Sequence, residues 1–281
     1  MKICRTIDEM RVASRLAHRE GRRLGFVPTM GALHEGHLSL MRAAKTKCEA
    51  VAVSIFVNPL QFAPTEDLAK YPRTFDHDRD RLEKEAIDIL FAPTPEEMYP
   101  TGAVTYVTVE GLSRKLCGKS RPGHFRGVTT VVAKLFHIVE PDLAFFGQKD
   151  AAQATIIRRM VQDLNLLVEI VVCPIVREPD GLAMSSRNAY LSQQERKSAL
   201  ILNRSLTEIK NRFNQGEHNA NALIAAGKQV LAQEPTVRLD YFEIVDPATL
   251  DPVQELTSSA LVAIAAFVGN TRLIDNILLP A

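Results

Sequence analysis

The chain has 281 residues, of which 46% are hydrophobic, and its 34 Lys and Arg nearly balance its 33 Asp and Glu. This length and apolar content suffice for one large domain or two smaller ones. A formal charge of +1, no Trp and only 6% aromatic residues argue against nucleic acid as an obligate partner, because that binding needs a basic surface or stacking aromatics.

The cysteines are isolated, and none belongs to a C-x-x-C pair. We therefore expect reduced and mostly buried thiols at Cys4, Cys48, Cys117 and Cys173. The N-terminal residues carry charges throughout, and no segment approaches eighteen consecutive apolar residues. These features predict a soluble, cytoplasmic protein without a membrane partner.

Short apolar runs alternate with amphipathic patterns over the first part of the chain. Strands are predicted at 24–27, 51–56, 88–91, 143–146 and 168–172. Helices are predicted at 37–48, 75–86, 128–139 and 151–164. This alternation predicts an α/β fold with a Rossmann-like, doubly wound parallel sheet, which we assign to a domain of residues 1–176.

The pattern changes after the turn signal Glu178-Pro179-Asp180-Gly181. Two long helices are predicted at 193–212 and 220–232. Three strands are predicted near 239–245, 260–268 and 271–278. We expect a smaller C-terminal α+β domain over residues 177–281.

The stretch Phe26–His37 reads F-V-P-T-M-G-A-L-H-E-G-H, and a helical pattern follows it. A strand that turns directly into a helix leaves unpaired backbone N–H groups at the helix start, and anions bind there. His34 and His37 can donate hydrogen bonds to oxygens that gain charge in a reaction. The stretch therefore favours phosphate chemistry, although two histidines that only cap a helix remain an alternative.

Two other nucleotide or metal motifs are disfavoured. A zincin site needs H-E-x-x-H, whereas His34 and His37 are three positions apart and no third ligand follows. Gly118-Lys119-Ser120 matches the end of a Walker A loop, but Ser113 stands where that loop requires glycine.

Four polar loops follow predicted strands, at 28–37, 58–62, 147–150 and 174–177. In parallel sheets, ligands bind at the carboxyl ends of the strands. Lys149 opens a helix, where a cation opposes the helix dipole unless an anion compensates for it. Gln153 follows one turn later and can face the same edge.

Two further segments carry phosphate-binding side chains. Met184–Asn188 (M-S-S-R-N) offers hydroxyls and a guanidinium that suit phosphate oxygens, or it is a simple polar turn. Arg121–Gly127 is a loop dense in cations. It either closes over an anionic ligand or is a solvated surface turn.

The H-x-G-H stretch together with M-S-S-R-N resembles the nucleotidyltransferase superfamily, which includes the class I aminoacyl-tRNA synthetases. More closely, the chain is similar to the pantoate–β-alanine ligase family. The matching stretches are 27–40, 53–62, 71–74, 121–136, 141–153 and 177–188.

This resemblance implies an ATP-dependent condensation of (R)-pantoate with β-alanine to pantothenate. Pantoate would attack the α-phosphate of ATP, giving pantoyl adenylate and pyrophosphate, and β-alanine would then release AMP. Mg²⁺ would accompany ATP as the cofactor, held through the phosphates with no residue assigned as a direct ligand. The family typically forms homodimers, and residues 177–281 would close over ATP.

The resemblance also implies roles for individual residues. The catalytic set would be His34, His37, Lys149 and Arg187. ATP would contact these four together with Met30, Gly31, Gly147, Gln148, Asp150, Val176, Met184, Ser185 and Ser186. Pantoate and β-alanine would contact Asn58, Gln61, Arg121 and Gln153. His77 departs from the family pattern, which has an acidic residue there, so its role stays open.

Two other functions remain as alternatives. One is a nucleotidyltransferase that acts on a phosphate acceptor, and the other is a nucleotide-sensing module without catalysis. The neutral amides of Gln61 and Gln153 disfavour a phosphate acceptor, which would require more cations.

Overall fold

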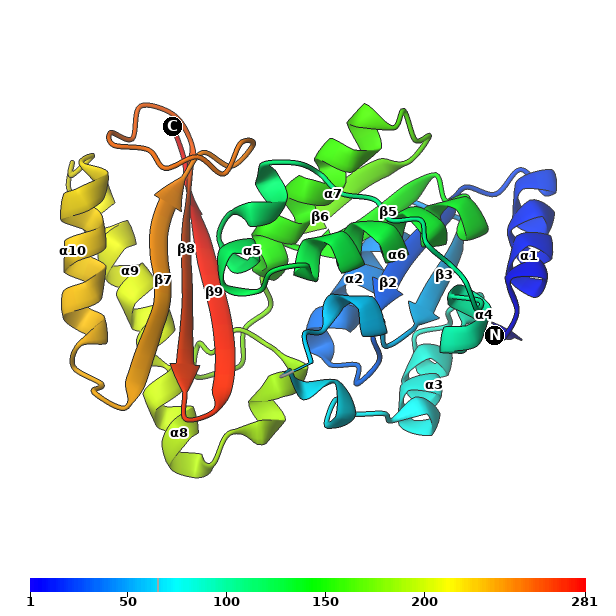
Figure 1. The fold of residues 1–281 in the computed structure, drawn as a ribbon, viewed down its shortest axis with the longest axis horizontal. Coiled ribbons are helices and arrows are strands. Elements are labelled where there is room, and N and C mark those ends of the chain that lie inside the picture. The colour runs from blue at the N-terminus through cyan, green and yellow to red at the C-terminus, as the bar shows by residue number, and fades with distance from the viewer. Residues whose placement is uncertain (65) are drawn as a thin grey trace. The chain divides into compact units, whose positions relative to one another are not determined.

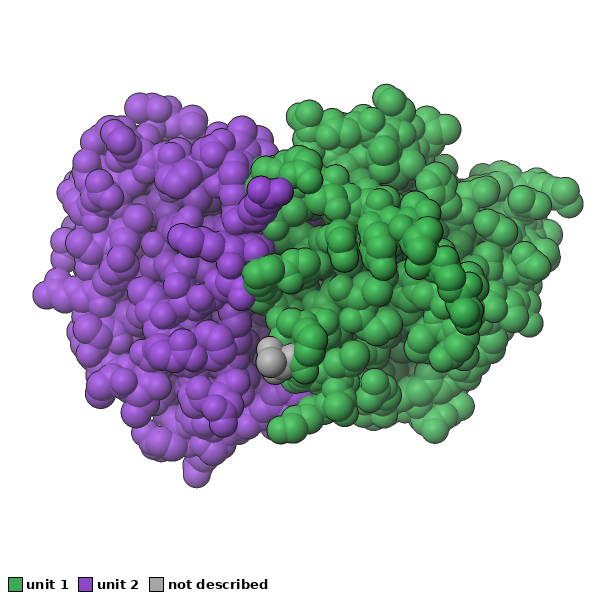
Figure 2. All heavy atoms as spheres, in the orientation of Figure 1, with its two compact units in different colours: residues 1–113, 121–147, 156–174 green, residues 114–120, 148–155, 175–281 purple. Residues whose placement is uncertain are grey.

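The computed structural model describes residues 1–64 and 66–281, which form two compact units (Figure 2). Unit 1 comprises residues 1–113, 121–147 and 156–174, and unit 2 comprises residues 114–120, 148–155 and 175–281. Segments 114–120 and 148–155 thus belong to unit 2, although they lie within the predicted domain 1–176. Side-chain bonds hold them there, from Ser120 to Asp240 and from Gln148 to Asn276.

Unit 1 is built on a parallel sheet with the strand order β1-β4-β3-β2-β5-β6. Figure 1 labels β2, β3, β5 and β6 of this sheet. The strands are β1 (Lys2–Cys4), β2 (Leu24–Thr29), β3 (Ala50–Ile55), β4 (Ile89–Phe91), β5 (Leu143–Gly147) and β6 (Glu169–Cys173). The sheet confirms the predicted doubly wound α/β fold. Only the short edge strand β1 was not predicted.

The helices of unit 1 connect successive strands. They are α1 (Ile7–Arg19), α2 (Glu35–Lys45), α3 (Phe75–Lys84), α4 (Pro95–Met98), α6 (His124–Val139) and most of α7 (Ala151–Asp163), whose first residues belong to unit 2. Leu38 and Met41 of α2 join one buried cluster with Val27 and Val53 of the sheet. Since side chains alternate along a strand, the buried side chain of Phe26 packs on the other face of the sheet from that of Val27.

Three of the four predicted helices begin within two residues of their predicted start. The exception is α6, which begins at His124 and not at residue 128, so the second half of the predicted loop 121–127 is helical. Helix α1 was not predicted. Its start carries a capping box of Thr6 and Glu9, a signal that the sequence does contain.

The strand order reverses at β2, with β3 on one side of it and β5 on the other. Phe26 of β2 pairs with Ala144 of β5, so both strands end at the same edge of the sheet. Ligands of doubly wound sheets bind at such a reversal. The H-E-G-H loop begins at this point.

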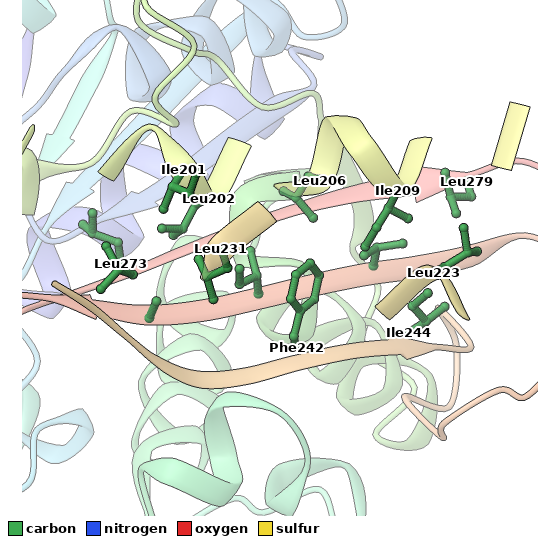
Figure 3. Packing of buried hydrophobic residues seen from close by; sticks show 14 of the residues in the cluster. Ile201, Leu202, Leu206, Ile209, Leu223, Leu231, Phe242, Ile244, Leu273 and Leu279 are labelled. Carbon is green, nitrogen blue, oxygen red and sulfur yellow. The ribbon is translucent and has the colours of Figure 1, made fainter. Parts of the chain in front are cut away.

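Unit 2 contains an antiparallel sheet of β7 (Val237–Val245), β8 (Ala260–Val268) and β9 (Thr271–Leu279). Its helices are α5 (Cys117–Ser120), α8 (Gln193–Ala199), α9 (Ile201–Asn214) and α10 (Ala220–Leu231). Figure 3 shows Leu206, Ile209 and Phe242 in the core where α9 and α10 pack on the strands. The α+β architecture is confirmed.

The prediction of one helix over 193–212 is wrong. The helix breaks at Leu200, whose N–H bonds to the carbonyl of Lys197 in a tighter turn. In a continuous helix, the four consecutive apolar side chains of residues 199–202 would point to nearly all sides of the helix axis. In the structure Ala199, Ile201 and Leu202 are buried, and Leu200 is partly buried against the same core.

All four cysteines are buried and free, as predicted. Across the described residues 1–64 and 66–281, none of the helices combines the length and the hydropathy that a membrane span requires.

Candidate active site

The loop between β2 and α2 is held in its conformation by a buried carboxylate. Gly31 and Ala32 both adopt left-handed backbone, with φ of 82° and 48°. Asp78 of α3 is fully buried, and its carboxylate accepts hydrogen bonds from the N–H groups of Ala32 and Leu33, both at 2.8 Å. These charge-assisted bonds fix the loop before the first histidine.

His34 and His37 lie at the start of α2, with ring centroids 4.1 Å apart. Nδ1 of His34 accepts from the N–H of Gly36 at 3.2 Å, and Nδ1 of His37 accepts from the N–H of His34 at 3.3 Å. The histidines therefore do cap the helix. Since Nδ1 accepts in both rings, the neutral imidazoles carry their proton on Nε2, and each Nε2–H is a donor.

Met30, Asn58 and Gln61, which the family resemblance assigns to ATP and pantoate, lie together. Asn58 is 1% exposed and precedes η1 (Pro59–Gln61). Its Nδ2 donates to Oε1 of Gln61 and to the carbonyl of Gly127, both at 3.1 Å. Gln61 Nε2 in turn donates to Met30 Sδ at 3.0 Å.

Tyr99 completes this group, and its hydroxyl donates to Asn58 Oδ1 at 2.8 Å. Burial raises the pKa of Tyr99, so the phenol keeps its proton and stays a donor. No sequence pattern signals this contact, because Tyr99 is an isolated aromatic 41 positions from Asn58.

The side chain of Arg121 forms an ion pair with Glu66 and is largely shielded from solvent. Its side chain is 15% exposed, and its guanidinium donates to both carboxylate oxygens of Glu66 at 2.7 and 2.5 Å. Burial raises the pKa of Glu66, but the hydrogen bonds and charge of Arg121 outweigh this, and the net pKa is lowered. Arg121 also donates to the carbonyl of Gln61 at 3.3 Å. The Arg121 side chain is therefore not solvated, whereas Pro122 and Gly123 beside it form an exposed turn, and closure of this segment over an anionic ligand stays a prediction.

In unit 2, Lys149 and Ser185 line one small cavity, together with Asn188 and Asp275. Lys149 lies in η4 (Gln148–Asp150), which follows Gly147 at the end of β5. Asp150 is exposed, and Gln153 is half-buried in the first turn of α7. Two segments that the sequence linked to phosphate thus meet in space.

The M-S-S-R-N segment has a defined structure. Met184 donates its N–H to the carbonyl of Val176 at 3.0 Å, which brings these two predicted nucleotide contacts together. Ser185 caps η5 (Ser186–Tyr190) by accepting from the N–H of Arg187 at 3.2 Å. Asn188 donates to Glu178 at 2.8 Å. These bonds order the segment, and a phosphate-binding role for its hydroxyls and guanidinium stays a prediction.

Comparison with known proteins identifies the family. The family model described as Pantoate-beta-alanine ligase matches residues 2–278. The chain belongs to the pantoate–β-alanine ligase family. A pantothenate synthetase of Koribacter versatilis is 58% identical over 281 residues, covering 100% of this chain and 97% of that protein. One of Thermotoga petrophila is 55% identical over 279 residues, covering 99% of this chain and all of that protein.

Solved structures of the pantoate–β-alanine ligase family agree with this fold. Pantothenate synthetase of Thermus thermophilus is 46% identical, with a TM-score of 0.94 and 99% of each chain covered. Pantoate-beta-alanine ligase of Francisella tularensis is 33% identical, with a TM-score of 0.80 over 99% of this chain and 97% of that one. The Francisella structure is described as complexed with beta-gamma ATP and beta-alanine.

The resemblance led us to expect an acidic residue at the position of His77. His77 is exposed on α3, whereas the neighbouring Asp78 is fully buried against the β2–α2 loop. Sequence reasoning missed Asp78. A usable signal was its spacing of four from Leu82, which places both on the apolar face of the predicted helix.

Residues 1–64 and 66–281 contain no group of three His, Cys, Asp or Glu side chains arranged to hold a metal ion. Magnesium bound to nucleotide phosphates takes only one or two protein carboxylates and keeps several waters. The exposed Asp150 beside Lys149 fits that requirement. The donor set is thus compatible with Mg²⁺ that arrives with ATP.

Proposed function

We propose that this chain catalyses the ATP-dependent condensation of (R)-pantoate with β-alanine, through pantoyl adenylate, to give pantothenate, AMP and pyrophosphate. The observation that carries the proposal is the proximity of Lys149 and Ser185, which border the same small cavity although they come from two separate segments of unit 2. The full-length family match, and the Francisella relative described with beta-gamma ATP and beta-alanine, support the same reaction.

In the first step, a carboxylate oxygen of pantoate attacks the α-phosphorus of ATP. The new P–O bond forms as the bond to the β-phosphate oxygen breaks, and pyrophosphate leaves. Two anions must approach each other, so cations and donors lower the barrier. Lys149, Arg187 and the Nε2–H groups of His34 and His37 are the donors in this proposal. Mg²⁺ would add further neutralisation at the phosphates.

The proposed pantoate contacts are neutral amides. Asn58 is fixed by Tyr99 and Gly127, and it orients the amide of Gln61. Neutral donors bind hydroxyls and a carboxylate without removing the nucleophilicity of the attacking oxygen. The charge of Arg121 is compensated by Glu66. This balance favours a carboxylate acceptor over a phosphate acceptor.

In the second step, the amine of β-alanine attacks the carbonyl carbon of the adenylate. The bond from this carbon to the bridging oxygen breaks, and AMP leaves with that oxygen on its phosphate. The amine loses a proton as the amide forms. The mixed anhydride must be kept from water, which favours closure of residues 177–281 over the nucleotide. We also propose that the protein acts as a cytoplasmic homodimer.

The test is an assay in two stages. ATP and pantoate should release pyrophosphate, and addition of β-alanine should then yield AMP and the amide. Pyrophosphate release with a phosphorylated acceptor, and none with pantoate, would favour the other nucleotidyltransferase. Binding of ATP without any pyrophosphate release would favour a sensing module.

A further inference from the structure

Two adjacent polar residues of β9, Asp275 and Asn276, are almost completely buried, with 4% and 3% exposure. Neither corresponds to a motif in the sequence analysis. Since successive side chains of a strand point to opposite faces, this pair can reach two different segments of unit 2. These segments are the ones that carry Lys149 and Ser185.

The side-chain nitrogen and oxygen of Asn276 both bond to the segment that carries Lys149. Its Nδ2 donates to the backbone carbonyls of Gln148 and Lys149, both at 2.9 Å. Its Oδ1 accepts from Nε2 of Gln148, also at 2.9 Å. These bonds fix the backbone of η4, from which the Lys149 side chain projects.

Asp275 holds the turn that leads to Ser185. Its carboxylate oxygens accept from Nη1 and Nη2 of Arg177 at 2.7 and 2.9 Å. Arg177 Nη1 also donates to the carbonyl of Gly181 at 3.1 Å, and Arg177 pairs with Ala183 in an antiparallel bridge. Asp275 itself lines the cavity together with Lys149 and Ser185.

We propose that Asp275 and Asn276 are positioning residues, which set the separation of Lys149 and Ser185 for the phosphates of ATP. This inference rests on the proposed function. Asn276 acts through the backbone of η4, and Asp275 acts through Arg177, whose guanidinium also donates to the carbonyl of Gly181. Two adjacent residues of the edge strand β9 would thus determine the positions of the segments that carry Lys149 and Ser185.

The variant that tests this is Asn276→Asp. It keeps the shape of the side chain but replaces both donors with an oxygen that repels the carbonyls of Gln148 and Lys149. Loss of two hydrogen bonds predicts about tenfold or greater weakening of ATP binding. The KM for pantoate should change much less than the affinity for ATP, because three of its four proposed contacts belong to unit 1 and keep their own bonds, and only Gln153 follows η4 in unit 2.

The matched control is Asn219→Ala, also in unit 2. Asn219 caps α10 by accepting from the N–H of Ala222 at 3.0 Å, and it donates to Glu255 at 2.9 Å. This variant should lower the thermal midpoint and leave ATP affinity unchanged. Asp275→Asn should weaken ATP binding as Asn276→Asp does.

Affinity for a non-hydrolysable ATP analogue is measured by calorimetry, beside steady-state kinetics and thermal unfolding. Weaker analogue binding with a much smaller change in the pantoate KM supports the inference. Unchanged ATP affinity, or equal changes for both substrates that follow the thermal midpoint, overturns it. If Asn276→Asp does not fold, Asn276→Ser removes the same donors without adding charge and is judged by the same outcomes. A wild-type protein without pantoate-dependent pyrophosphate release would instead refute the proposed function.

Discussion

Gly127 lies in the first turn of α6, directly against the loop that carries Asn58 and Gln61. A Cβ atom at this position would lie 2.3 Å from the carbonyl oxygen of Leu60 and 2.6 Å from the N–H nitrogen of Gln61. Both are backbone atoms, so no side-chain rotation can relieve the contact. The loop or the helix must shift by about 1 Å for Gly127→Ala to reach ordinary van der Waals distance.

That shift has two consequences. Overpacking of this kind destabilises a fold by about 1–3 kcal/mol. A displacement of about 1 Å in a positioning element can lower a rate by about a hundredfold. We expect Gly127→Ala to raise the KM for pantoate or lower kcat by that order, with a much smaller change in the KM for ATP.

The matched control is Gly227→Ala in α10, where a Cβ would lie 2.7 Å from the ring of Phe242 in the core of unit 2. It should lower stability without a specific effect on pantoate. Initial rates of pyrophosphate release at varied pantoate, with thermal unfolding of both variants, provide the comparison. Pantoate kinetics of Gly127→Ala that equal those of the wild type would refute the reasoning.

Three further predictions concern the same unit. His37→Ala should slow adenylate formation by about two to four orders of magnitude, as expected for a lost transition-state donor, and near-normal pyrophosphate release would contradict this. Asp78→Asn should cost about 2 kcal/mol of unfolding free energy in denaturant titrations, because two backbone donors lose a charged acceptor, whereas the exposed Asp76→Asn should cost less than about 0.5 kcal/mol. The pKa of Glu66 is lowered by Arg121, so its stabilising contribution is complete above the ordinary value of 4.5 and is lost as the pH falls below it. Glu66→Gln should therefore lose stability at neutral pH and approach the wild type in acid. A constant difference at all pH values would contradict the ion pair.

The sequence was sufficient for the elements whose patterns are local. The five predicted strands of unit 1 and the three of unit 2 follow from apolar runs bounded by Gly and Pro. The break at Leu200 was not predictable in this way, because the helical pattern continues through it and Leu200 keeps helical backbone angles, so only its hydrogen bonding differs.

For the site, motif spacing and the family resemblance led to the proposed ligand contacts but not to the residues that hold them in place. His34, Gln61, Lys149 and Ser185 stand in recognisable loops. Their supports come from distant positions, as Asn276 lies 127 residues after Lys149. Such pairs share no local pattern, and only the fold brings them together.

The central claim is that this chain forms an acyl adenylate from pantoate and ATP. The most direct measurement is exchange of labelled pyrophosphate into ATP with β-alanine omitted. The account predicts exchange that requires pantoate and is reduced by about a hundredfold or more in His37→Ala. Exchange that proceeds without pantoate, or its absence while the protein binds ATP, would contradict the account.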